Sequence, residues 1–93
     1  MANKNSDCCR TLIFDEDGIN EFAAKLRKIR IREGLSQSQL AFEAGLSLSQ
    51  VARIETSRIN PTICTVFALS RALNIPVSEL FAFELAPKEK QIL

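Results

Sequence analysis

The chain of 93 residues contains no histidine, tryptophan or tyrosine, and it has only three cysteines. Without histidine or a C-x-x-C pair, the sequence offers no zinc ligand set, and we predict no metal site. It also contains no nucleophile elbow, no glycine-rich phosphate loop and no cluster of ligating carboxylates, which argues against an enzyme. We therefore expect neither a cofactor nor a catalytic residue.

Long hydrophobic runs are also missing from the sequence. No apolar stretch approaches the roughly 20 residues that cross a bilayer, and the first residues lack the apolar segment of a secretory signal. We therefore expect a cytosolic protein with no membrane partner and with reduced thiols. A thiol switch at the adjacent Cys8 and Cys9 remains an alternative.

The net charge of +1 conceals an uneven distribution of charged residues. Residues 1–24 carry two basic and five acidic side chains, whereas residues 25–60 carry seven basic and three acidic ones. The central segment is therefore basic enough to contact nucleic-acid phosphates, although such clusters also occur on solvated helix faces. The length leaves room for one compact domain with short tails.

Apolar spacing together with start and stop residues predicts five helices and no strand. They are expected over residues 19–33, 37–44, 48–56, 63–73 and 77–83. The first should bury a stripe formed by Ile19, Phe22, Ala23, Leu26 and Ile29. The fourth should begin at a Thr62 cap, end at Asn74 and bury Ile63, Val66, Leu69 and Leu73. This pattern predicts an all-α fold.

The second and third helices are marked by the same local device. Ser36 and Gln39 have the spacing of a capping box, and Ser47 and Gln50 repeat it. Helices of about eight residues are not stable alone, so these two should share one core. The turn at residues 45–47 is too short for an antiparallel pair, so the helices should cross steeply.

The segment QSQLAFEAGLSLSQVARIET, residues 37–56, resembles the helix-turn-helix of the lambda repressor and Cro family, also called the XRE family. Ala41 is small where the helices cross, and Gly45 suits the left-handed turn. The flanking sequences NPT and LSRALNIPVSELF extend the resemblance over about residues 22–81. It implies a five-helix lambda-repressor-like DNA-binding domain over residues 19–83, in a prokaryotic or phage context. Residues 1–18 would then be an acidic N-terminal arm, and residues 84–93 a C-terminal tail.

The resemblance also implies which side chains meet DNA, with the third helix in the major groove. The expected base contacts are Leu48, Ser49, Gln50 and Arg53. The expected phosphate contacts are Gln37, Ser47, Arg58 and Asn60. Alternatives remain open, since Gln50 can instead serve its capping box, Leu48 can make a protein contact, and Arg53 or Arg58 can be a solvated charge.

Two further expectations concern an ion pair within the domain and the assembly of two copies. The family pairs an arginine of the first helix with a glutamate near the end of the third, and Arg30 and Glu55 occupy those positions. One domain of this size contacts few base pairs, so we expect a homodimer on a near-palindromic double-stranded operator. Leu80 and Phe81 are expected to close the core, whereas Phe83 and Leu85 are expected at the dimer interface.

Together these features predict a sequence-specific DNA-binding transcriptional regulator that represses other genes or its own. The same fold also serves a module that recruits polymerase, since repression and activation differ only in operator position. An antitoxin-like protein with a second protein partner is the main rival hypothesis. A redox sensor acting through Cys8 and Cys9 is a third.

Overall fold

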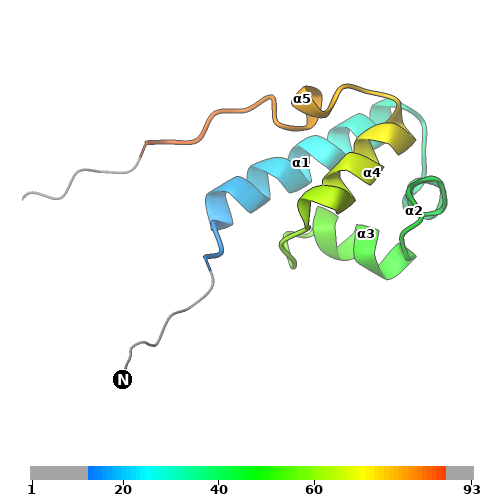
Figure 1. The fold of residues 1–93 in the computed structure, drawn as a ribbon, viewed down its shortest axis with the longest axis horizontal. Coiled ribbons are helices and arrows are strands. Elements are labelled where there is room, and N and C mark those ends of the chain that lie inside the picture. Colours follow the sequence, from blue (N-terminus) through cyan, green and yellow to red (C-terminus); the bar gives the residue numbers. More distant parts are fainter. Residues whose placement is uncertain (1–12, 88–93) are drawn as a thin grey trace, which may run out of the picture.

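The computed structural model describes residues 13–87, which contain five α-helices and no strand. Figure 1 shows helices α1 (Glu16–Arg32), α2 (Gln37–Ala44), α3 (Leu48–Glu55), α4 (Ile63–Leu73) and α5 (Val77–Leu80). The predicted all-α fold with five helices is confirmed. The bounds of α2 and α4 agree with the prediction to the residue, because both helices carry strong terminal signals.

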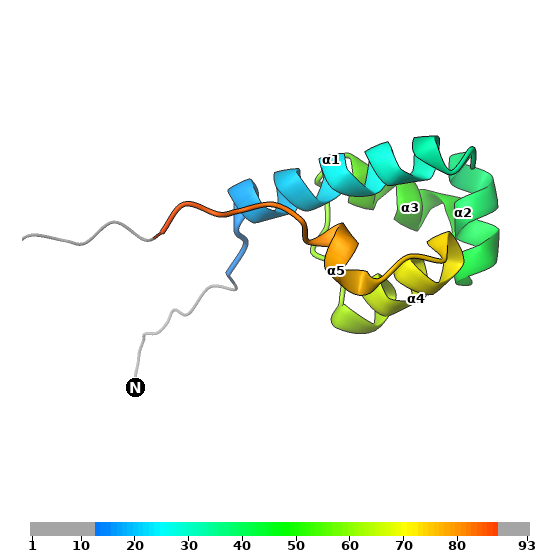
Figure 2. The ribbon, with the colours of Figure 1, turned by 90° about the horizontal axis from the view of Figure 1, so that it is seen from above.

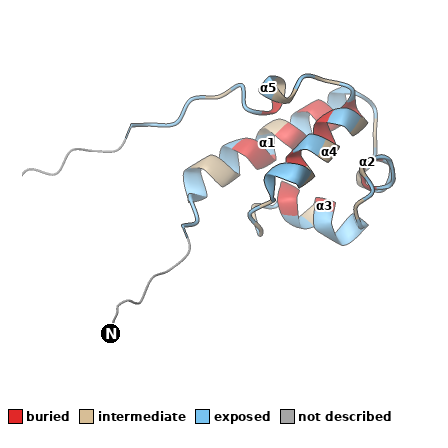
Figure 3. Ribbon diagram, in the orientation of Figure 1, coloured by how far each residue is buried: buried red, intermediate tan, exposed pale blue. Residues whose placement is uncertain are grey.

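The five helices surround one apolar core. α1 packs against α3 and α5, and α2 packs against α3 and α4. The buried faces turn toward one another in Figure 3, and together they supply Phe22, Leu26, Ile29, Leu40, Ala41, Val51, Ile54, Val66, Leu69, Leu73 and Leu80. Both ends of the described chain leave the bundle on the same side, beside the start of α1 (Figures 1 and 2). The α2–α3 pair lies toward the opposite end of α1 (Figures 1 and 2).

The helix ends are fixed by local hydrogen bonds. Both predicted capping boxes are present, with Ser36 and Gln39 at the start of α2 and Ser47 and Gln50 at the start of α3. The Thr62 side chain caps α4 by accepting a hydrogen bond from the Thr65 backbone N–H. These caps satisfy N–H groups that have no partner inside their helices, so they define where each helix begins.

Four predicted helix bounds are wrong, one of them the end of α1, which falls at Arg32 with Glu33 as its C-cap. α1 begins at Glu16 rather than Ile19, because the Asp15 carboxylate caps it by accepting from the Gly18 backbone N–H at 3.0 Å. The expected boundary of the acidic arm at residue 18 therefore falls inside α1. α3 ends at Glu55, with Thr56 as its C-cap, and α5 stops at Leu80 instead of continuing to residue 83.

Two predicted core positions are also wrong. Ile63 is 58% exposed, because it lies in the first turn of α4, at the edge of the buried stripe. Phe81 is 43% exposed, because α5 ends before it and its ring turns back onto the surface of Phe22, with ring centroids 5.5 Å apart. Leu80 is fully buried, as predicted.

Several features bear on function classes. Within the described part of the chain, no helix is long and apolar enough to cross a membrane. Residues 13–87 also contain no group of three or more His, Cys, Asp or Glu side chains that could hold a metal ion. Cys64 is an exposed thiol, whereas Cys8 and Cys9 lie outside the described residues.

Candidate nucleic-acid interface

Helix α3 has one buried face and one exposed face. Val51, Ile54 and Glu55 are buried against the rest of the domain. The exposed face carries all four predicted base-contacting residues, which are Leu48, Ser49, Gln50 and Arg53. Figure 3 shows this division along the helix. Arg53 takes part in none of the ion pairs found among residues 13–87, so its guanidinium is available to a ligand.

The turn between α2 and α3 sets the steep crossing of the two helices. Gly45 has a φ of 71°, a left-handed conformation that residues with a Cβ resist. The Leu46 backbone N–H then donates to the Ala41 carbonyl at 2.8 Å, which closes the end of α2. Ala41 is buried in the core, where a small side chain lets α2 and α3 approach closely.

Gln50 is used by the cap of its own helix. Its Oε1 accepts a hydrogen bond from the Ser47 backbone N–H at 3.0 Å, and the Ser47 hydroxyl oxygen accepts from the Gln50 backbone N–H at 3.0 Å. Of the two roles considered for Gln50, the protein without DNA adopts the capping one. Its Nε2 and the hydroxyl hydrogen of Ser47 remain as possible donors.

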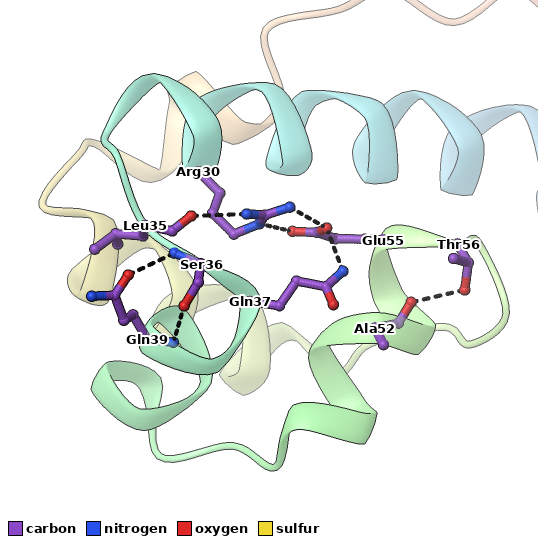
Figure 4. A network of polar contacts seen from close by, with 8 residues as sticks. All are labelled: Arg30, Leu35, Ser36, Gln37, Gln39, Ala52, Glu55 and Thr56. Atoms are coloured by element: carbon purple, nitrogen blue, oxygen red, sulfur yellow. Dashed lines mark hydrogen bonds and ion pairs between the residues drawn. The ribbon is translucent and has the colours of Figure 1, made fainter.

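A buried carboxylate joins three helices at the end of α3 (Figure 4). Arg30 of α1 donates from Nε to Glu55 Oε2 at 2.6 Å and from Nη2 to Glu55 Oε1 at 3.0 Å. The pair that the family resemblance implies is thus present. Arg30 Nη1 donates to the Leu35 carbonyl at 2.8 Å. The Glu55 side chain is only 1% exposed, so this bidentate geometry compensates for the water that the carboxylate has lost.

Gln37, the first residue of α2, completes this network. Its Nε2 donates to Glu55 Oε1 at 2.9 Å, and the residue is half-buried. The sequence reasoning missed this contact, because Gln37 and Glu55 are 18 residues apart and no local pattern joins them. With Arg30 and Gln37 in place, none of the buried side-chain nitrogen and oxygen atoms in the described residues lacks a partner.

The loop after α3 bends back sharply at Ser57. This residue has a φ of 63°, and the next backbone N–H, that of Arg58, donates to the Arg53 carbonyl at 2.8 Å. The exposed residues Arg58 and Asn60 follow this bend, on the loop between α3 and α4. The left-handed conformation was not predicted, because serine rarely adopts it.

An apolar groove of about 450 Å³ lies at the start of α1. It is lined by α1, by the start of α4 and by the segment after α5, and Asn60 and Pro61 of the α3–α4 loop also contribute. Both predicted interface residues line it. Leu85 is 48% exposed, whereas Phe83 is half-buried and packs against the core. Phe81 lies between Phe22 and Phe83, with a centroid distance of 6.3 Å to the latter.

Comparison with known proteins places the chain among regulators. Residues 26–80 match the HTH_3 helix-turn-helix family. Over 67 residues, the chain is 42% identical to the immunity repressor protein of Bacillus phage phi105, a match that covers 72% of this chain and 46% of that protein. Over 69 residues it is 33% identical to the HTH-type transcriptional regulator PuuR of Escherichia coli, covering 74% and 37%. The chain therefore spans less than half the length of these curated relatives.

Solved structures agree with these sequence relatives. The restriction-modification controller protein C.AhdI from Aeromonas hydrophila matches with a TM-score of 0.67 and 38% identity, over 68% of this chain and 96% of that one. An HTH_3 family transcriptional regulator from Vibrio cholerae matches with a TM-score of 0.69 and 29% identity, over 71% and 37%. The likeness to C.AhdI includes almost the whole of that chain.

Proposed function

The chain belongs to the HTH_3 helix-turn-helix family, and on that premise we propose that it regulates transcription by placing α3 in the major groove of double-stranded DNA. The family match confirms the prediction of a lambda-repressor-like domain, and the relatives, which by name are a repressor, a transcriptional regulator and a controller protein, support a protein that is not an enzyme. Repression is the favoured mode, because the relative at 42% identity is a repressor by name.

The observation that carries this proposal is that α3 has an exposed face while its last residue, Glu55, is held in place by two other helices. The buried Glu55 is held by α1 and α2, so α3 has little freedom to turn about its own axis. A major groove about 12 Å wide accepts an α-helix with its side chains. The exposed face of α3 is therefore available to base edges, and its orientation is already set before DNA binds.

Within this proposal Arg53 is the main base-reading residue. An arginine can donate two hydrogen bonds to guanine O6 and N7, which discriminates by about 1–3 kcal/mol against other bases. Ser49 offers a hydroxyl to a base edge or a phosphate, and Leu48, 50% exposed, offers methyl groups to a thymine methyl. Gln50 contributes through its Nε2, since its Oε1 serves the cap.

Phosphate contacts are proposed on both sides of α3. The expected set is the first turn of α2 at Gln37, together with Ser47, Arg58 and Asn60. The first N–H groups of a helix have no partner within it and lie at the positive end of the helix dipole, so they suit a phosphate oxygen. These contacts fix the position of the domain on the duplex and carry no sequence information directly.

We further propose that a second copy of the chain covers the apolar groove, with Phe83 and Leu85 at the contact. Asn60 and Pro61 line this groove and also follow α3, so a two-fold axis here would bring two α3 helices close together. On B-DNA, half-sites of such a dimer lie about 34 Å apart on one face of the duplex. The operator is then expected to be nearly palindromic.

The decisive experiment selects bound duplexes from a random DNA pool and compares three variants on the selected sequence. Arg53→Ala should relax the preference at one base pair, by about 1–3 kcal/mol. Arg58→Ala should weaken binding to all sequences alike and reduce the salt dependence by about one counterion. Arg71→Ala, in the last turn of α4, is the matched control and should bind normally. Failure of the wild-type protein to enrich any duplex at low salt would refute the proposed function.

A further inference from the structure

The orientation of the Gln37 amide follows from the chemistry of its partner, the Glu55 carboxylate. A carboxylate accepts hydrogen bonds and donates none, so the nitrogen of the Gln37 amide must face Glu55, at 2.9 Å. Two donors of Arg30 bind the same carboxylate. In Figure 4 the Gln37 carbonyl oxygen accordingly points away from Glu55. The amide is therefore committed to the protein before any DNA is present.

We propose that Gln37 is a positioning residue, which connects the first turn of α2 to the last turn of α3 and keeps this contact when DNA binds. The phosphate at this helix end would then meet backbone N–H groups of the α2 first turn rather than the side chain. This inference rests on the proposed function, and it replaces the side-chain phosphate contact that the family resemblance implies for Gln37.

Electrostatics favours this division of roles. The Gln37 Nε2 has a second hydrogen, but a phosphate oxygen bound to it would lie only about 5 Å from Glu55 Oε1, given normal hydrogen-bond lengths and the amide angle. Two anions at that distance repel each other, even with Arg30 nearby. The backbone N–H groups at the start of α2 can bind the phosphate without placing it beside the carboxylate.

The position of Glu55 explains how the hydrogen bond between Gln37 and Glu55 affects DNA recognition. Glu55 is the last residue of α3, and Arg53 lies two residues before it on the exposed face. The contacts from Arg30 and Gln37 approach the carboxylate from two different helices. Loss of the Gln37 contact leaves the Glu55 carboxylate bonded to α1 alone, so the aim of Arg53 at a base becomes less well defined.

The first test observes the amide directly. Protein labelled with 15N glutamine contains four side-chain amides, and the Gln37 signal is the one missing from Gln37→Met. Slow hydrogen exchange is expected at the Gln37 Nε2 in the free protein, together with an unchanged chemical shift after addition of the duplex that the wild type selects. Fast exchange in the free protein, or a large shift on binding, would overturn it.

The second test is a double-mutant cycle between Gln37→Met and Arg53→Ala, read by fluorescence anisotropy on the same duplex. The cycle is run at a temperature where circular dichroism shows every variant folded. Arg53→Ala should cost about ten- to a hundredfold in affinity in the native background. In the Gln37→Met background it should cost less than about threefold, because the arginine is no longer aimed. Additive losses would mean an independent phosphate contact, and would overturn the proposal.

Gln39→Met is the matched control for this cycle. Gln39 lies on the same helix, and among the described residues its Oε1 accepts only from the Ser36 backbone N–H, so its loss weakens the α2 cap without touching Glu55. The loss of affinity caused by Arg53→Ala should be the same in the Gln39→Met background as in the native one. A smaller loss there would mean that fraying of α2 explains the result, and it would overturn the role of Gln37. A wild-type protein that selects no duplex would instead overturn the proposed function, while the exchange measurement on free protein still stands.

Discussion

The two halves of α1 have opposite surroundings. Near its C-terminal end, Arg30 enters a network in which each buried polar atom has a partner, supplied by α2 and α3. Near its N-terminal end, Phe22 borders an apolar groove whose outer residues, such as Phe81 and Leu85, remain close to half exposed. Residues 13–87 complete the first region with their own side chains and leave the second uncovered.

This difference separates two kinds of stabilisation. A buried ion pair adds little net stability over apolar packing, but it fixes the geometry of the helices that it joins. An exposed apolar groove has the opposite effect. Burying it against another surface stabilises the assembly but does little to fix the relative orientation of the two surfaces. The polar end therefore sets the orientation of α3, and the apolar end is where we expect self-association.

The largest effect is expected at the polar end, from Arg30→Ala. This change leaves the Glu55 carboxylate buried without its ionic partner, which should lower the free energy of unfolding by about 3–5 kcal/mol. Arg27→Ala, on the exposed side of the same helix, is the control and should change it by less than about 0.5 kcal/mol. Urea denaturation followed by circular dichroism compares the two, and equal midpoints would show that the ion pair does not hold the domain together.

At the apolar end, Leu85→Glu should weaken the dimer by about 2 kcal/mol or more while leaving each domain folded. A charge in the contact must be desolvated, whereas in the monomer the side chain remains close to half exposed. Analytical ultracentrifugation over a range of concentrations measures the shift. Phe42→Glu, at an 84% exposed aromatic of α2, is the matched control; if it dissociated the protein as well, the groove would not be the contact.

A smaller effect is expected within the polar end, from Ser47→Ala. It removes the side-chain acceptor for the Gln50 backbone N–H and should cost about 1 kcal/mol of unfolding free energy. It should also release Gln50 from the reciprocal cap. Ser49→Ala, two residues further on, makes no such bond among the described residues and should be nearly neutral. Thermal melts compare the two variants, and a Ser47→Ala protein with the melting temperature of the wild type would contradict the prediction.

The smallest effect is a gain in stability from Ser57→Gly. Ser57 has a φ of 63°, which costs a residue with a Cβ about 1 kcal/mol, so glycine should raise the unfolding free energy by about 0.5–1 kcal/mol. Ser49→Gly, within α3, should lower it by a similar amount. Opposite shifts of the two melting temperatures are expected, and shifts of the same sign would argue against strain at Ser57.

The sequence predicted best what is encoded locally. The bounds of α2 and α4 follow from Ser36, Gly45, Thr62 and Asn74, because capping residues act within one turn of the chain. The start of α1 was missed because the predicted apolar stripe begins only at Ile19, one turn after the Asp15 cap. The end of α5 was missed because no stop residue follows Leu80, and the turn at Phe81 depends on a contact with Phe22.

The candidate site divides in the same way. The exposed face of α3 follows from helical periodicity, and the pairing of Arg30 with Glu55 came from the family resemblance. The bond between Gln37 and Glu55 could not be read from the sequence, because it depends on the angle at which α2 and α3 cross. The groove was equally hidden, since it needs three segments brought together by the fold.

The use of Gln50 in its own cap has a consequence at the scale of a genome. With the Gln50 carbonyl oxygen already bonded, the proposed reading helix has few side chains left for base edges and would specify only about two or three base pairs. A given triplet recurs about once in every 64 base pairs of random DNA, so one domain alone could not distinguish one promoter from the many others. Two domains held at a fixed spacing multiply their selectivity, and promoter occupancy would then rise steeply with the abundance of the protein.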